Sequence, residues 1–280
     1  MCSNLKEILP IEQKKILVEM LKYIDDICRK NKIKYSLTGG TAIGAVRHKG
    51  FIPWDDDIDI ILDRDNYFKL IEVLENNNND DYKVLIPGKS ENYPLQFAKL
   101  VNKKTLVVEY GIPKELKNYG LFVDIFYYNY MTNNMGKNKK FYKKLTFLRK
   151  SLYKTSLQNN SLSFAHKTVR FLKNTYLSIF GYKRVLNEIL KMFDSCPKDY
   201  TDYVLSNNPG YRFEQELQNT ENILNYTDIE FEGQKVMIFK NYHEILKTSF
   251  GDYMKLPPKE KRNSHNLKAY WREYNEKAKK

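Results

Sequence analysis

Cysteine and histidine are scarce in this chain. It holds 3 cysteines and 4 histidines in 280 residues. The cysteines are far apart and match no metal-ligand spacing, and the histidines form no His-x-x-x-His pair. The cysteines are Cys2, Cys28 and Cys196, and the histidines are His48, His166, His243 and His265. These spacings argue against a zinc site.

Long apolar segments and two common nucleotide-binding motifs are also missing. No apolar run approaches the ~20 residues that a transmembrane helix needs, and residues 1–6 do not form a positive-then-apolar leader. With so few cysteines, we therefore expect a cytoplasmic protein. The chain has no Gly-x-x-x-x-Gly-Lys-Ser/Thr and no Gly-x-Gly-x-x-Gly, which argues against P-loop and dinucleotide-binding domains.

The net charge is concentrated in one segment. Residues 136–191 carry 14 Lys or Arg against one acid, Glu188, a net +13 that equals the +13 of the whole chain. Apolar residues at helical spacing predict two helices, separated near residues 158–161. They are Phe141, Leu145, Leu148 and Leu152, then Val169, Leu172, Tyr176 and Ile179.

This basic insert has three interpretations. It is an accessory helical subdomain with solvated lysines, or a surface at 136–191 for an anionic membrane or for an acidic or lipid-linked glycan. The membrane interpretation places the protein peripherally at the inner face of the membrane. Nucleic-acid binding finds little support, because no aromatic-rich RNA motif accompanies the charge.

A glycine pair marks one candidate ligand site. Residues 33–37 alternate like a half-buried strand, Thr38-Gly39-Gly40 interrupts it, and residues 41–46 start a short helix. Gly39 and Gly40 permit positive φ and a close approach of the backbone to a ligand, and Thr41 adds a hydroxyl. Such a turn binds phosphate, although an ordinary strand-to-helix turn is the plain alternative.

Four aspartates follow within five positions, at Asp55, Asp56, Asp57 and Asp59. Residues 57–62 have the period-two pattern of a strand, which predicts that Asp57 and Asp59 point to one face and the isoleucines to the other. Two carboxylates this close repel each other unless a cation or a shared proton intervenes. We therefore predict a site for a hard divalent cation, with a solvated acidic turn as the alternative.

Asp124 is a further candidate. It is the single charge in the apolar run 120–126, which predicts a buried strand. A lone buried carboxylate is costly unless it is paired, hydrogen-bonded or bound to a metal. A metal-binding or catalytic role is favoured over a structural hydrogen bond. Together, these features suggest metal-assisted chemistry on a phosphate ester.

The order of these features resembles the nucleotidyltransferase fold. The sequence of residues 39–60 is similar to the signature of the LicD phosphocholine transferase family, which is related to fukutin and the fukutin-related protein. Residues 120–126 resemble the family's third-carboxylate strand, and residues 250–265 its C-terminal block. The resemblance implies an α/β (α+β) fold with a nucleotidyltransferase-like mixed sheet flanked by helices, here with the basic insert.

The resemblance also implies an activity. A phospho-alcohol, in first place phosphocholine, passes from a CDP-alcohol donor such as CDP-choline to a sugar hydroxyl of a cell-surface glycan such as teichoic acid, lipopolysaccharide or capsule, and CMP leaves. Asp57 and Asp59 would bind Mg²⁺ or Mn²⁺ with Asp55 as a contributor. Asp124 would complete the site and take the acceptor proton.

Other residues receive donor-binding roles from the same resemblance. Gly39, Gly40 and Thr41 would hold the donor phosphates, and Arg47, His48 and Lys49 would neutralise the diphosphate or shape the pocket. The family often has a lysine at the position of Lys99. Donor contacts are also implied for Arg262 and His265, for which a role as ordinary surface-loop residues is an equal alternative.

Two other functions stay open. Nucleotidyl transfer from an NTP to a small acceptor would use the same three aspartates, Asp57, Asp59 and Asp124. A non-enzymatic membrane or nucleic-acid binder would act through the basic helices instead. The choice among choline, ribitol and glycerol donors is also open, because it depends on a pocket that the sequence does not reveal.

The rest of the chain is predicted from periodicity. We expect a catalytic core over 1–130, the basic insert over 131–195, and a C-terminal part over 196–280 that completes the core and the donor site. Helices are predicted at 11–30, at 64–76 with Asp63 as N-cap, at 242–250 ended by Leu256-Pro-Pro258, and at 266–280. Strands are predicted at 82–86, 96–101, 105–110 and 121–127, with the second and third paired. A hairpin is predicted around Gly233.

Overall fold

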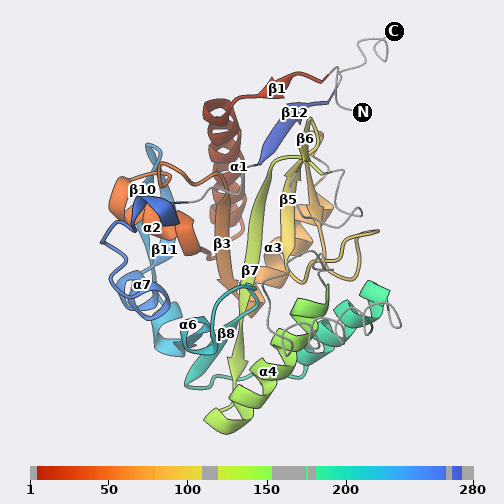
Figure 1. Ribbon diagram of the computed structural model, residues 1–280, viewed down its shortest axis with the longest axis vertical. Coiled ribbons are helices and arrows are strands. Elements are labelled where there is room, and N and C mark those ends of the chain that lie inside the picture. The colour runs from red at the N-terminus through yellow and green to blue at the C-terminus, as the bar shows by residue number, and fades with distance from the viewer. Residues whose placement is uncertain are drawn as a thin grey trace.

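A mixed β-sheet forms the middle of the molecule in the computed structural model (Figure 1), which describes residues 5–77, 79–108, 119–152, 175, 181–262 and 267–272. Among these residues the sheet has seven strands, in the order β2-β3-β7-β5-β4, with β8 paired to β7 and β9 to β8. Strands β3 and β7 are parallel, and the other pairs are antiparallel. The strands are β2 (Ser36–Leu37), β3 (Ile58–Asp63), β4 (Tyr82–Leu85), β5 (Ala98–Asn102), β7 (Phe122–Met131), β8 (Tyr203–Ser206) and β9 (Leu217–Asn219).

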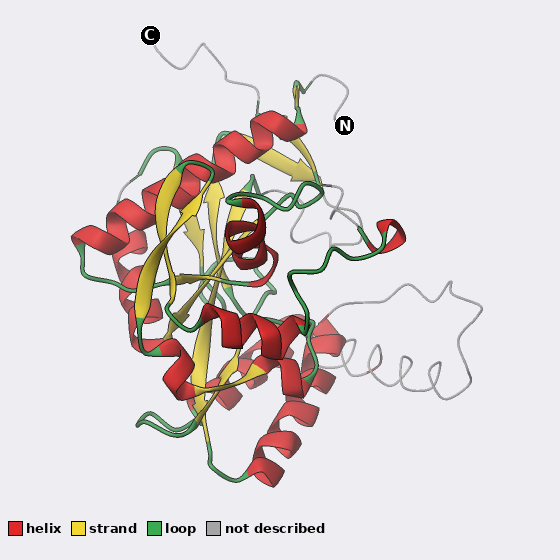
Figure 2. Cartoon of the chain, turned by 90° about the vertical axis from the view of Figure 1, so that its left-hand side faces the viewer, coloured by secondary structure: helices red, strands yellow, loops and turns green. Residues whose placement is uncertain are grey.

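Helices flank this sheet, as the view turned by 90° also shows (Figure 2). Helices α1 and α3 contact β7, and α3 also contacts β3 and β4. The helices are α1 (Pro10–Lys30), α2 (Gly39–His48), α3 (Arg64–Asn76), α4 (Met135–Leu152), α6 (Phe213–Glu216), α7 (Tyr242–Phe250), the 3-10 turns η2 (Thr220–Ile223) and η3 (Lys259–Lys261), and a helical stretch at 181–194. The predicted mixed α/β architecture is confirmed.

Helix α3 shows how closely the local sequence determines its ends. The carboxylate of Asp63 accepts a hydrogen bond from the Asn66 backbone N–H at 2.9 Å, so Asp63 is the predicted N-cap. The predicted apolar face is buried against the sheet at Tyr67, Leu70, Ile71 and Leu74. Both the helix and its cap are confirmed.

Alternation along β3 and β7 gives the sheet one apolar face. Ile58 and Ile60 of β3 and Val123 and Ile125 of β7 are 0% exposed. Successive side chains of a strand point to opposite faces, so the residues between them lie on the other face. The site is built on that other face.

The predicted hairpin around Gly233 is confirmed as β10 (Tyr226–Phe231) and β11 (Gln234–Phe239). Glu232 and Gly233 at its turn have positive φ of 49° and 75°, which is usual for a tight hairpin turn. Strand β11 contacts β2, and β10 contacts α2. The hairpin therefore supports the segment that carries the glycine pair.

Two predictions about β6 and the C-terminal residues are wrong. A helix was expected over 266–280, but residues 268–271 form strand β12 (Lys268–Trp271) between β1 (Glu7–Ile8) and β6 (Thr105–Val108). Strand β6 therefore pairs with β12 and not with β5. The helix predicted at 242–250 is confirmed as α7 (Tyr242–Phe250), although Gly251, with φ of 69°, stands at its end and not the later prolines.

A second hydrophobic cluster lies beneath the basic insert. Leu145, Leu148 and Leu152 of α4 are buried, as their spacing predicts, against Val185, Ile189 and Phe193 of the 181–194 stretch. Leu205 of β8 joins this cluster, which ties the insert to the sheet. The predicted apolar face over 169–179 lies almost wholly outside the described residues, and the three domain boundaries stay predictions.

Candidate active site

Two acidic residues and one lysine form a row across three neighbouring strands. Asp59 of β3 is the register partner of Asp124 of β7, and Asp124 is the register partner of Lys99 of β5. Register partners on adjacent strands project from the same face of a sheet. The structure therefore brings together two of the three predicted catalytic carboxylates with the predicted lysine.

Lys99 and Asp124 form a buried ion pair. Their Nζ and Oδ1 atoms are 2.5 Å apart, and the two side chains are 4% and 12% exposed. The ammonium also lies 3.3 Å from the centre of the Phe122 ring, in the geometry of a cation–π contact. The orientation of Lys99, which the sequence left open, is thus inward and toward the carboxylate.

Asp59 carries the strongest electrostatic perturbation in the row. Its pKa is raised well above its ordinary value, first by burial and then by the negative charges of Asp57, Asp124 and Asp55, with Lys99 acting in the opposite direction. The four carboxylates are therefore close enough to repel one another. One detail of the prediction is wrong: β3 begins at Ile58, so Asp57 lies in the segment before the strand.

The N-terminus of α2 faces these carboxylates. Gly39 and Gly40 are its first two residues, and Gly39 has φ of 58°. A methyl group on Gly39 would stand 3.1 Å from Oδ2 of Asp59, and one on Gly40 would overlap the Asp55 carboxylate. The glycines thus begin a helix where we expected a turn, and they allow the acidic groups to approach its backbone.

Thr41 links the helix to the aspartate strand. Its hydroxyl oxygen accepts a hydrogen bond from the Asp59 backbone N–H at 2.9 Å, and Thr41 is 2% exposed. The carbonyl oxygen of Asp59 in turn accepts from the Thr38 N–H at 3.1 Å. These two bonds fix the position of Asp59 in β3 relative to the start of α2.

Arg47 and His48 lie at the other end of α2. Nε of Arg47 donates to Nε2 of His48 at 2.9 Å, and Nη1 donates to the carbonyl oxygen of Tyr253 at 2.7 Å. The pKa of His48 is lowered by burial and by Arg47. The imidazole is therefore neutral near pH 7 and accepts through the nitrogen that faces Arg47.

Lys49 and the C-terminal block are placed differently. The Lys49 ammonium is 3.6 Å from Glu230 of the hairpin, and the lysine side chain is 74% exposed. Arg262 stacks on the Trp54 ring, with 4.9 Å between its guanidinium carbon and the ring centre. The pKa of Arg47 is lowered mainly by burial and, to a smaller extent, by the positive charge of Arg262. Arg262 therefore lies near both Arg47 and the aspartate segment, whereas His265 is outside the described residues.

Trp54 and the first aspartates also border an open pocket of about 360 Å³. Lys14 of α1 and Lys268 of β12 contribute to its lining, together with Asp55 and Asp56. Asp56 also accepts a hydrogen bond from the Leu267 backbone N–H at 3.3 Å. This pocket was not predicted, because its walls come from both ends of the chain.

Tyr211 is the neighbour that the sequence reasoning missed. Its hydroxyl oxygen would be 3.7 Å from a methyl group on Gly39. Its pKa is raised, first by burial and then by Asp59, Asp57 and Asp55. A tyrosine in a loop, among 22 tyrosines, gave no periodic signal that would have singled it out.

The donor set fits a hard cation in its chemistry. Asp55, Asp57, Asp59 and Asp124 offer carboxylate oxygens, the ligands that Mg²⁺ prefers, and the mutual repulsion seen at Asp59 is what a divalent cation would relieve. Within the described ranges, no three His, Cys, Asp or Glu side chains already stand at metal-binding distances. Magnesium binding by these residues is therefore a proposal.

A comparison with protein families defines the class of the domain. Residues 32–171 match the family described as "LicD/FKTN/FKRP, nucleotidyltransferase domain", and this stretch includes the aspartates and Lys99. The mixed sheet is consistent with a nucleotidyltransferase-like domain. The protein is similar over 274 residues, at 31% identity, to the lipopolysaccharide cholinephosphotransferase LicD of Haemophilus influenzae.

That alignment covers 94% of this chain and 98% of the relative. The chain therefore belongs to the LicD family and is a homologue of a LicD-type cholinephosphotransferase, as the sequence predicted. The chain is also similar over shorter stretches to two uncharacterized proteins, at 41% identity over 58 residues to one of Rickettsia prowazekii and at 39% identity over 66 residues to one of Rickettsia typhi. These stretches cover about a fifth of each relative.

Proposed function

We propose that this protein transfers a phospho-alcohol, in first place phosphocholine, from a CDP-alcohol donor to a sugar hydroxyl of a cell-surface glycan, and releases CMP. The observation that carries the proposal is the row of Asp59 and Asp124, in register beside the N-terminus of α2. Similarity along nearly the whole length of a lipopolysaccharide cholinephosphotransferase supports the choice of donor and of a lipopolysaccharide acceptor. Teichoic acid and capsule are the other glycans with such hydroxyls.

The chemistry asks mainly for position and charge, because phosphoryl-type transfer needs no covalent enzyme intermediate. Asp124 takes the proton of the acceptor hydroxyl in this proposal. Lys99, 2.5 Å away, pairs with Asp124 and fixes its direction. A positioned general base of this kind contributes typically ~10²–10⁴-fold.

Asp57 and Asp59, with Asp55 at their side, would hold Mg²⁺ or Mn²⁺, which would neutralise the donor diphosphate. The Asp55 and Asp59 carboxylates lie against Gly40 and Gly39 at the N-terminus of α2. A helix N-terminus favours negative charge. The proposed diphosphate therefore approaches the carboxylates at this end of α2, next to Thr41.

The wide pocket beside Trp54 suits the CMP half of the donor. It measures about 360 Å³ and shares Asp55 with the carboxylate cluster, so a nucleoside there would leave its phosphates beside the aspartates. An indole face stacks on nucleobases, and Lys14 and Lys268 line the same pocket beside Glu7, Asp55 and Asp56. Arg262, on the Trp54 ring, is within reach of the same end of the donor.

The basic insert supports a second element of the proposal, peripheral contact with an anionic membrane where lipid-linked acceptors lie. Six lysines of α4 are exposed, and each would add roughly 1 kcal/mol near an anionic surface. They are Lys137, Lys139, Lys140, Lys143, Lys144 and Lys150. In the part of the chain that the structure describes, no helix is long and apolar enough to cross a membrane.

The deciding experiment measures CMP release from CDP-choline, CDP-ribitol and CDP-glycerol with Mg²⁺ and a purified acceptor glycan. Asp57→Ala and EDTA serve as controls. Metal-dependent CMP from CDP-choline supports the proposal, and preference for another donor corrects the alcohol. If no donor yields CMP but labelled ATP leaves AMP on an acceptor, the protein is a nucleotidyltransferase. Membrane sedimentation that survives Asp57→Asn with no turnover would favour a non-enzymatic binder.

A further inference from the structure

A buried glutamine that the proposed reaction does not use borders the pocket beside Trp54, called the Trp54 pocket below. Gln13 lies in the first turn of α1 and is 5% exposed. Among the described residues that line this pocket, it is the one carboxamide. The other side chains there are carboxylates, lysines, prolines, a leucine and the Trp54 indole. Gln13 is therefore the neutral polar group that a ligand meets in this pocket.

A hydrogen bond fixes which end of the carboxamide is available. Nε2 of Gln13 donates to the carbonyl oxygen of Ile8 at 2.8 Å, in a buried contact. Oε1, the other end, accepts from no donor in the described part of the chain, and it is not among the fully enclosed unpaired atoms. A carboxamide oxygen has two lone pairs to offer. Since the pocket is the open space that Gln13 borders, Oε1 is available to a ligand there.

The wall that carries Gln13 is tied to the other walls of the pocket. Ile8 belongs to β1, which pairs with β12. Nζ of Lys14, the residue after Gln13, donates to the carbonyl oxygen of Pro53 at 3.4 Å, next to Trp54. The carboxamide is thus held relative to the indole, and a site held in this way loses little conformational entropy when it binds a ligand.

An acceptor of this kind distinguishes cytosine from uracil. Cytosine carries an exocyclic amino group, which donates, whereas uracil carries a carbonyl oxygen at the same position, which only accepts. The amino group would satisfy Oε1 of Gln13. The carbonyl oxygen would place two acceptors against each other and leave both unpaired, and a buried polar group without its partner is costly. Discrimination therefore comes largely from the rejection of uracil.

The three carboxylates of the pocket are placed less well for this task. Glu7 is exposed, so water competes for its oxygens. Asp56 already accepts a hydrogen bond from a backbone N–H at 3.3 Å, and Asp55 lies against the N-terminus of α2, where the proposed diphosphate binds. Gln13 is buried, and a hydrogen bond in such surroundings is stronger than one in water.

We propose that Gln13 selects cytosine over uracil in the donor, by accepting a hydrogen bond from the cytosine amino group at Oε1. The inference rests on the proposed function, which places the CMP half of the donor in the Trp54 pocket. The base stacks on the indole there, and its amino edge meets the carboxamide. The pocket is thus a site for cytidine nucleotides and not for nucleotides in general.

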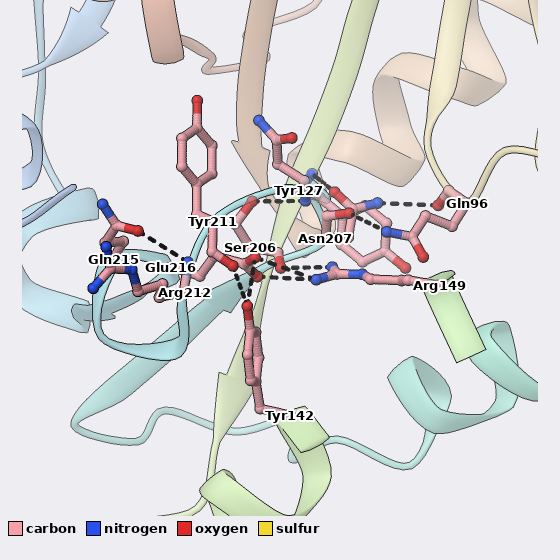
Figure 3. A network of polar contacts seen from close by, with 11 residues as sticks. Gln96, Tyr127, Tyr142, Arg149, Ser206, Asn207, Tyr211, Arg212, Gln215 and Glu216 are labelled. Carbon is pink, nitrogen blue, oxygen red and sulfur yellow. Dashed lines mark hydrogen bonds and ion pairs between the residues drawn. The ribbon is translucent and has the colours of Figure 1, made fainter. Parts of the chain in front are cut away.

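Gln96 supplies a matched control, within the polar network of Figure 3. It is 3% exposed, and its Nε2 donates to the carbonyl oxygen of Asn207 at 2.8 Å. Its Oε1 has no partner within the described ranges either, but it is fully enclosed. The same network contains the buried salt bridge of Arg149 with Glu216, at 3.1 Å. Gln13 and Gln96 therefore lose the same kind of bond on substitution, and only Gln13 lines the Trp54 pocket.

The test measures the binding of CMP and UMP by calorimetry, with Mg²⁺ present, to the wild type, Gln13→Met and Gln96→Met. One buried hydrogen bond left unmade corresponds to roughly 5–150-fold in affinity. The wild type should therefore bind CMP more tightly than UMP by a factor in this range. Gln13→Met should bring the two affinities within about twofold of each other, and Gln96→Met should keep the wild-type preference.

A change in the ligand tests the same contact without a substitution in the protein. The analogue of CMP in which hydrogen replaces the amino group has no donor at that position, so the wild type should bind it more weakly than CMP by the same factor. Circular dichroism shows whether each variant is folded. Equal wild-type affinities for CMP and the analogue, no binding of either nucleotide, or a folded Gln13→Met that still prefers CMP would overturn the inference.

Nucleotide binding needs no turnover, which keeps this inference distinguishable from the proposed function. If no CDP-alcohol yields CMP but the preference for CMP over UMP depends on Gln13, the proposed reaction fails and the role of Gln13 stands. If CDP-choline is turned over but Gln13→Met keeps the wild-type preference, the role of Gln13 fails and the reaction stands.

Discussion

The ammonium of Lys99 lies 2.5 Å from Oδ1 of Asp124, and the two residues face each other across β5 and β7. Breaking a buried ion pair by removing one partner costs typically about 3–5 kcal/mol, because the other charge stays buried without compensation. We expect Lys99→Met to lower the free energy of unfolding by an amount in this range. Urea denaturation followed by circular dichroism measures it.

Lys83→Met, on the exposed face of the neighbouring β4, is the control and should change stability by less than about 0.5 kcal/mol. The double variant Lys99→Met/Asp124→Asn should be more stable than Lys99→Met alone, because no charge is left unpaired. If the double variant were less stable than both single variants, Lys99 and Asp124 would not stabilise each other as an ion pair.

Asp124→Asn tests the proposed base. The amide keeps the size of the side chain but does not accept a proton, so CMP release should fall by ~10²–10⁴-fold. Asp65→Asn is the control. Asp65 lies on the exposed side of α3, so this variant leaves the carboxylates of the site unchanged and should keep wild-type activity. A folded Asp124→Asn with more than a tenth of wild-type turnover would rule out Asp124 as the base.

Gly40→Ala tests the close approach of Asp55 to α2. The new methyl group would overlap the Asp55 carboxylate, so this side chain must move. We expect lower kcat/KM with near-normal stability, because alanine suits the first turn of a helix. Gly136→Ala at the start of α4 is the matched control, since its methyl group meets only the Asn134 side chain at 3.3 Å. Equal activities of the two variants would contradict the placement of Asp55.

The raised pKa of Glu216 should make the free energy of unfolding depend on pH. Burial raises its pKa to about 7, although Arg149 acts in the opposite direction. A carboxyl with a folded pKa above its unfolded value of about 4.3 binds more protons in the native state between these values. The free energy of unfolding should therefore fall as pH rises from about 4.3 to 7, and stay level above that range with respect to this group.

Glu216→Gln removes the titrating group, so its unfolding free energy should vary less between pH 5.5 and 8 than that of the wild type. Chemical denaturation at several pH values gives both curves. Parallel curves for the two proteins would show that Glu216 is already ionised at pH 5.5, with the salt bridge to Arg149 outweighing its burial.

Local signals in the sequence predicted the elements that local interactions determine. Helix α3 begins after Asp63 because the cap and the apolar face both lie within its own residues. The hairpin at Gly233 is confirmed for the same reason. The aspartate strand and the Asp124 strand were found because a charge in an apolar run is conspicuous whatever its partner.

The errors concern partners that are distant in the chain. Strand β12 is short, and only its pairing with β1 and β6 makes it a strand, so its own pattern was open to a helical interpretation. Tyr211 was missed because its role comes from the Tyr142 and Glu216 contacts that fix its loop. Long-range pairing and loop placement have no counterpart in periodicity.

The parallel pairing of β3 with β7 has a consequence for the order in which the protein folds and becomes active. Asp59 and Asp124 are 65 positions apart in the chain and become neighbours only when these strands align. Pairings between distant segments form slowly, because the intervening chain must be closed into a loop first. During refolding, helical structure should return before nucleotide turnover does. Newly synthesised chains would therefore pass through a folding intermediate that is compact and helical but catalytically inactive.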